Sequence, residues 1–173
     1  MTWRGLESVN RKSEEGSGMG KFVVGIGNVL LRDEGIGCHV VHALERVPLP
    51  DVEIIDGGTR PDVLELLEDT DKLVIVDAVK GGGVPGQIYR FHPEDITLEQ
   101  KPVLSLHDTS LIDSLKLMQL WHNIGEAVII GVEPGDLRWG LELSPELQEK
   151  MPQIIDAILE ELSNTNPKGE TKC

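Results

Sequence analysis

Two patterns of apolar residues alternate along this chain. Short apolar runs rich in β-branched residues occur at 21–26, 52–56, 72–77, 87–91 and 127–132. Several are continuously apolar, which is typical of strands covered on both faces. Between and after them lie stretches in which apolar residues recur every three or four positions, as in an amphipathic helix. The pattern therefore predicts strands and helices that alternate along the chain.

Four such stretches predict helices, at 36–47, 61–69, 109–121 and 144–162. Their ends carry the residues that helix termini favour. Pro61 suits the first turn of the second helix, and Asp108 or Thr109 can cap the third. Ser144 followed by Pro145 is a typical start for the last helix.

Alternating strands and helices favour an α/β fold, a three-layer α/β/α sandwich around a mostly parallel sheet of about five strands. One strand is expected to be an exception. The Gly-rich link at 78–86 is too short for a crossover between parallel neighbours, which needs about a dozen residues. We therefore expect strand 87–91 to run antiparallel, as a hairpin partner at one edge of the sheet.

The folded part is expected to be one domain over residues 21–162. Residues 1–20 are polar and lack the apolar segment of a secretory signal, so we expect a disordered leader or a cloning remnant there. Residues 163–173 read as a flexible tail. No apolar run approaches the roughly 20 residues that a transmembrane helix needs, so no membrane partner is expected.

Charge and cysteine content narrow the possible partners and the compartment. The net charge is −14, which argues against nucleic acid and anionic membranes and favours a neutral or basic partner, or a cation. Cys38 and Cys173 are the two cysteines, and their spacing indicates neither a disulfide framework nor a metal site. A reducing, cytoplasmic location fits this composition.

The candidate functional residues lie where predicted strands end. Glu34, Asp56 and Asp77 follow three of the strands, and His107 immediately precedes the third helix. Ligands of open α/β sheets bind beyond the carboxyl ends of the strands, where these side chains are expected to meet. Oxygen and nitrogen ligands suit zinc, nickel or cadmium. The sequence predicts a metal site of Glu34, Asp77 and His107.

Each of these residues also has a plain structural interpretation. Asp77 is equally well read as a turn former or helix cap, His107 as a buried histidine and Glu34 as a solvated loop acid. Other catalytic patterns fit less well. A triad that includes Ser105 lacks a nucleophile elbow, and the Asp-Thr-Ser triplet at 108–110 is better explained by helix capping than by aspartic-protease chemistry.

The glycines of the first loop do not indicate a nucleotide site. Gly25, Gly27, Gly35 and Gly37 do not form the G-x-G-x-x-G pattern, and the leucines between them are too bulky for a phosphate cradle. Acidic residues in the same loop would repel phosphate. We expect these glycines to let the chain turn sharply and to start a helix against the sheet.

Three segments together resemble one protein family. "GIGNVLLRDEGIG" at 25–37, "VIVDAV" at 74–79 and "SLHD" at 105–108 are similar to motifs of the nickel–iron hydrogenase maturation endopeptidases, and the resemblance covers roughly 21–162. It implies a peptidase that removes the C-terminal extension of the hydrogenase large-subunit precursor after nickel insertion. It also implies that Glu34, Asp77 and His107 bind the metal. Asp56 matches the family's aspartate before two glycines and is expected to have a supporting role in the substrate cleft, where Asp33 is also expected.

The resemblance further implies that nickel arrives with the substrate and is not a resident ion, and that cadmium or zinc can substitute in crystals. A monomer is expected. The chain departs from the family pattern at Arg60-Pro61 and at Glu133, where many members have glutamine. Three alternatives stay open: a non-catalytic metal-sensing or chaperone module, a dinucleotide-binding regulatory domain, and a peptidase of the same architecture with another substrate.

Overall fold

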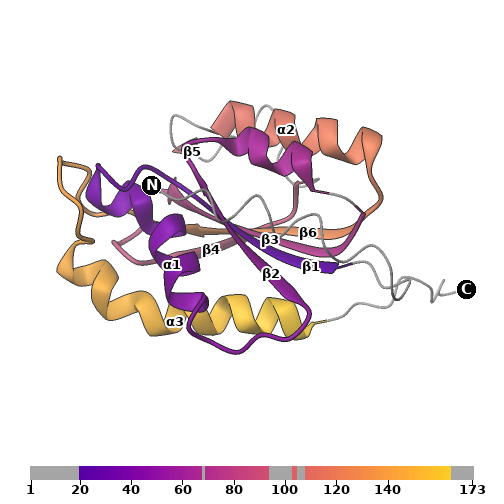
Figure 1. Cartoon of the computed structure of the whole chain (residues 1–173). Helices are drawn as coiled ribbons and strands as arrows, with labels where there is room; N and C mark the ends of the chain where they lie inside the picture. The colour runs from indigo at the N-terminus through magenta and orange to yellow at the C-terminus, as the bar shows by residue number, and fades with distance from the viewer. Residues whose placement is uncertain (1–19, 68, 94–102, 105–107, 165–173) are drawn as a thin grey trace, which may run out of the picture.

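The computed structural model describes residues 20–67, 69–93, 103–104 and 108–164 (Figure 1). All of the expected leader except Gly20, and most of the expected tail, lie outside these ranges. The elements in chain order are β1 (Gly20–Ile26), η1 (Arg32–Gly35), α1 (Ile36–Leu44), β2 (Val52–Gly58), η2 (Pro61–Leu66), β3 (Thr70–Lys80), β4 (Ile88–Phe91), β5 (Val103–Leu104), α2 (Asp108–Trp121), β6 (Ile124–Val132) and α3 (Pro145–Ser163).

One sheet forms the middle layer, with its main strands in the order β2-β1-β3-β6-β4. β2, β1, β3 and β6 are parallel to one another, and β4 lies antiparallel to β6 at the edge. The short β5 pairs antiparallel with β3. This arrangement confirms the expected α/β sandwich with a mostly parallel sheet and an antiparallel edge strand.

The expected hairpin of β3 and β4 is wrong. β6 inserts between them and pairs with both, through Val76 opposite Ile130 and through Tyr89 opposite Gly131. The residues of the two strands account for this order. β6 carries the continuous apolar run AVIIGV, and all six of these residues are buried, whereas the shorter β4 (IYRF) includes the exposed Arg90 and suits the edge.

Two other local predictions also differ from the structure. The stretch expected as an α-helix at 61–69 instead begins with the six-residue 3-10 helix η2, Pro61–Leu66. The two-residue strand β5 was not expected at all. It is too short to produce a recognisable apolar run.

Helices cover both faces of the sheet. α1 and α3 pack on one face and α2 with η2 on the other, as Figure 1 shows. Neighbouring residues of β1 point to opposite layers, with Val23 in the α1–α3 core and Val24 in the α2–η2 core. Continuous apolar strands are therefore the expected consequence of two covered faces. Within the described ranges, no helix has the length and apolar character needed to cross a membrane.

Candidate active site at the carboxyl ends of the strands

Glycines allow α1 to begin directly against the sheet. A Cβ atom on Gly37 would collide with the carbonyl oxygens of Ile26 and Val76, and one on Gly25 with the carbonyl oxygen of Gly37. Gly27 has φ of 149°, a conformation that side chains rarely adopt. The first turn of α1 therefore rests on the ends of β1 and β3. These glycines serve close packing, as the sequence predicted.

Glu34 and Asp77 are two acids buried at this edge. Glu34 lies in η1 and is 7% exposed, and Asp77 lies near the end of β3 and is 0% exposed. The Ala78 backbone N–H donates to Oδ1 of Asp77 over 2.8 Å. η1 contacts β3, so the elements that carry these acids touch. Burying a carboxylate costs free energy, so two buried carboxylates at one edge make this edge a candidate functional site.

Asp56 lies on the other side of β1, at the end of β2. Its backbone pairs with Gly25, which also pairs with Val76 of β3, so one strand separates Asp56 from the end of β3. Oδ1 of Asp56 accepts from the Gly58 backbone N–H over 3.0 Å, and Oδ2 lies 2.8 Å from Nε2 of His42. The side chain of Asp56 is 38% exposed, so this carboxylate is accessible from solvent.

The Cys38 thiol lies close enough to Asp56 and Asp77 to interact with their charges. Burial raises the pKa of this thiol, and the negative charges of Asp56 and Asp77 raise it further. Its Sγ donates to the carbonyl oxygen of Gly27 over 3.5 Å, and the residue is 1% exposed. A protonated, buried thiol is a poor nucleophile, so Cys38 acts as a small packing residue.

We predict that Cys38 is unreactive in the folded protein. In a Cys173→Ser chain, DTNB should label Cys38 at least about a hundred-fold more slowly than it labels the same chain in denaturant, because access and thiolate formation are both suppressed. Absorbance at the wavelength of the released thiolate measures the rate. Labelling of the native protein at the denatured rate would contradict the assignment.

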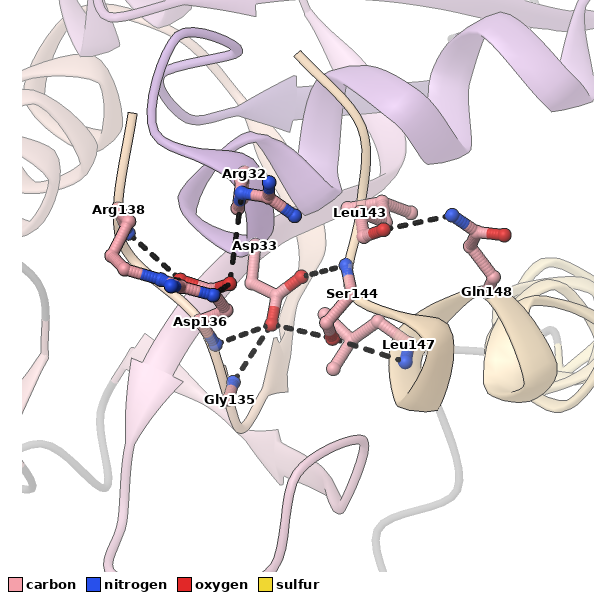
Figure 2. Close-up of polar contacts among 9 residues, drawn as sticks. All are labelled: Arg32, Asp33, Gly135, Asp136, Arg138, Leu143, Ser144, Leu147 and Gln148. Atoms are coloured by element: carbon pink, nitrogen blue, oxygen red, sulfur yellow. Dashed lines mark hydrogen bonds and ion pairs between the residues drawn. The ribbon is translucent and has the colours of Figure 1, made fainter. Parts of the chain in front are cut away.

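Asp33 does not face solvent, although the sequence placed it in the substrate cleft. It is 0% exposed and accepts four hydrogen bonds, as Figure 2 shows. The donors are the backbone N–H groups of Gly135, Asp136 and Ser144 and the hydroxyl of Ser144, over 2.7–2.8 Å. Asp33 thus connects η1 to the loop at 133–144, and a contact with substrate stays a prediction.

Ser144 links this buried acid to α3. Its Oγ donates to Oδ2 of Asp33 and accepts from the backbone N–H of Leu147 over 3.4 Å. The helix cap expected from the sequence is therefore confirmed, but its second partner was not foreseen. Spacing alone cannot reveal it, because Asp33 and Ser144 are 111 residues apart.

Glu133, one of the departures from the family pattern, has a structural role. Its Oε2 accepts from the Gly81 backbone N–H over 2.7 Å and from the Tyr89 hydroxyl over 2.8 Å. Burial alone would raise the pKa of Glu133, but hydrogen bonds from Tyr89 and from the backbone of 81–83 lower it. The carboxylate therefore stays ionised and fixes the glycine loop between β3 and β4.

The third expected metal ligand, His107, lies outside the described residues, as does Ser105. Among the residues whose placement the structure gives, no three His, Cys, Asp or Glu side chains form a group that could hold a metal ion. A site that needs His107 is not tested by this observation. The metal site of Glu34, Asp77 and His107 stays a prediction.

Comparison with known proteins identifies relatives of this chain. Residues 38–161 match the model of a family described as hydrogenase maturation protease. A putative hydrogenase maturation protease of Methanocaldococcus jannaschii is 34% identical over 144 residues, which span 80% of this chain and 91% of the relative. The hydrogenase 2 maturation protease of Escherichia coli is 35% identical over 145 residues, 80% and 87% of the two chains.

Solved structures show the same similarity. The hydrogenase maturating endopeptidase HybD from E. coli superposes with a TM-score of 0.73 at 30% identity, covering 84% of this chain and 93% of its own. The [NiFe] hydrogenase maturation protease HybD from Thermococcus kodakarensis has a TM-score of 0.70 at 26% identity, with 84% and 100% coverage.

Proposed function

The chain belongs to the hydrogenase maturation protease family, whose members are peptidases, and from this premise we propose that it removes the C-terminal extension of a nickel–iron hydrogenase large-subunit precursor. The observation that carries the proposal is the pair of buried acids, Glu34 and Asp77, at the carboxyl edge of a sheet with this family's fold. We place this reaction in the cytoplasm, after nickel insertion, and expect the enzyme to act as a monomer.

We propose that Glu34, Asp77 and His107 bind nickel that the precursor carries as part of the substrate. The oxygen atoms of the two carboxylates suit a divalent ion, and the ion would offset their mutual repulsion. Recognition of the ion would position the precursor's extension across the strand ends. Cadmium or zinc, which accept the same ligand types, would be stand-ins for nickel.

Hydrolysis then requires a water molecule and a group that accepts its proton. The water oxygen attacks the scissile carbonyl carbon, the carbon–nitrogen bond breaks, and the proton passes to the leaving amine. A carboxylate near the metal-binding edge is the proposed proton carrier. Asp56 is the solvent-accessible candidate, because its side chain is 38% exposed whereas that of Asp77 is buried.

Incubation with precursor tests the proposal directly. Nickel-loaded precursor should lose its extension, whereas precursor without nickel should stay intact or be cut at least about a hundred-fold more slowly, because the metal contacts position the tail. Mass spectrometry of both fragments measures the cut.

Other outcomes identify the alternatives. Nickel-dependent binding without cleavage would indicate a metal-sensing or chaperone module. Stabilisation by a dinucleotide, with no response to nickel, would indicate a regulatory domain. Equal cleavage with and without nickel would contradict metal recognition while leaving the peptidase activity intact.

A further inference from the structure

Three large apolar side chains are exposed on two loops, the one after β1 and the one at 133–144. Both loops lie beside the carboxyl edge of the sheet that carries Glu34 and Asp77, which we call the acidic edge. Leu30 is 48% exposed, Trp139 77% and Leu141 65%. Their backbones lie together, because Gly140 N–H donates to the Leu30 carbonyl and Arg32 N–H donates to the Gly140 carbonyl, each over 3.0 Å. We call Leu30, Trp139 and Leu141 the loop patch.

The loop patch rests on a fixed backbone. Arg32 has φ of 48°, a left-handed conformation that is unfavourable for arginine and is retained only where its surroundings enforce it. Its side chain packs against Gly140, where a Cβ atom would lie 2.7 Å from Nε, and Nε lies 3.6 Å from Oδ2 of Asp136. The buried carboxylate of Asp33 accepts from the backbone N–H groups of Gly135 and Asp136 in the same loop (Figure 2). A rigid support reduces the entropy lost when a partner binds.

We propose that the loop patch docks the body of the hydrogenase large-subunit precursor, next to the extension that is cleaved. This inference rests on the proposed function. Leu30 lies four residues before Glu34, and Trp139 lies three residues after Asp136, which bonds to Asp33. The patch is therefore continuous with the acidic edge that the precursor must reach. Exposed tryptophan and its exposed neighbour Arg138 are residue types that often dominate binding energy.

Within the described residues, no segment covers the patch, whose three side chains are 48–77% exposed. A dimer through this patch is disfavoured, because two chains that each carry a net charge of −14 repel one another. Three side chains are also few for the roughly 800 Å² of surface that each partner buries in a stable dimer. A transient protein substrate suits a patch of this size.

A double variant tests the docking site. Trp139→Ala with Leu141→Ala should raise the KM for nickel-loaded precursor at least about ten-fold and leave kcat within about two-fold, because only binding is removed. Leu117→Ala with Leu120→Ala is the matched control, since these side chains of α2 are 41% and 79% exposed on the other side of the sheet. The control should have an unchanged KM. Thermal unfolding checks that both variants fold.

Binding of precursor to immobilised enzyme separates this inference from the proposed function. If the wild-type chain binds precursor without cutting it and the double variant does not bind, docking is supported although the peptidase proposal fails. Cleavage with an unchanged KM in the double variant would overturn docking alone. Wild-type protein that neither binds nor cuts would overturn both. Loss of a wild-type dimer in the variant, with precursor KM unchanged, would show that the patch joins two copies.

Discussion

Exchange of Asp77 for asparagine is expected to lower kcat/KM for nickel-loaded precursor by about a hundred-fold or more. Asparagine preserves the shape of the side chain and the Oδ1 acceptor that the Ala78 N–H uses. It removes the negative charge from a fully buried position, where little solvent screens its attraction to a cation. Loss of a metal-binding charge has an effect of this size.

Asp113→Asn is the matched control, because this exposed aspartate lies on α2 and should leave kcat/KM within about two-fold. Initial rates of precursor cleavage, with thermal unfolding of each variant as a check on folding, provide the measurement. A folded Asp77→Asn chain that cuts at the wild-type rate would remove Asp77 from the proposed site.

Glu34→Gln and His107→Ala extend the same test to the other proposed ligands. If the three residues act as one site, combining Glu34→Gln with Asp77→Asn should cost little more than either change alone, because residues that act as a unit are not additive. Normal cleavage by His107→Ala would show that the histidine is not part of the site.

Asp33→Asn is expected to lower the free energy of unfolding by about 3 kcal/mol, because hydrogen bonds to a charged acceptor contribute roughly 1.5–3 kcal/mol each. The carboxylate accepts all four bonds with its two oxygens. An amide has only one oxygen, so at least one buried N–H loses its acceptor. For a chain of this size the melting temperature should fall by roughly 6–12 °C.

Asp62→Asn serves as the comparison for stability. Its side chain is 53% exposed and bonds only to Arg60 among the described residues, over 2.9 Å. Exposed ion pairs contribute little, so this change should stay within about 1 kcal/mol of wild type. Urea unfolding followed by circular dichroism measures both variants. Equal stability of Asp33→Asn and wild type would show that the buried acid does not hold the loop at 133–144.

Much of the fold was predictable because it depends on local patterns. Strands covered on both faces have continuous apolar runs, as in the six buried residues from 127 to 132. The short link after β3 correctly predicted an antiparallel edge strand, and Ser144 correctly predicted the start of α3. The position of β4 was not predictable in the same way, because strand order depends on contacts between distant segments.

The sequence by itself determined the alternation of strands and helices and placed Glu34, Asp56 and Asp77 at one edge, because parallel strands all end on the same side. Only the tertiary structure decided which acid of η1 fastens the loop at 133–144. Asp33 and Glu34 are adjacent and chemically alike, and it is Asp33 that accepts from Gly135 and Ser144, 102 and 111 residues away. Those donors reach Asp33 only when the loop at 133–144 folds over η1. No local sequence pattern predicts this contact.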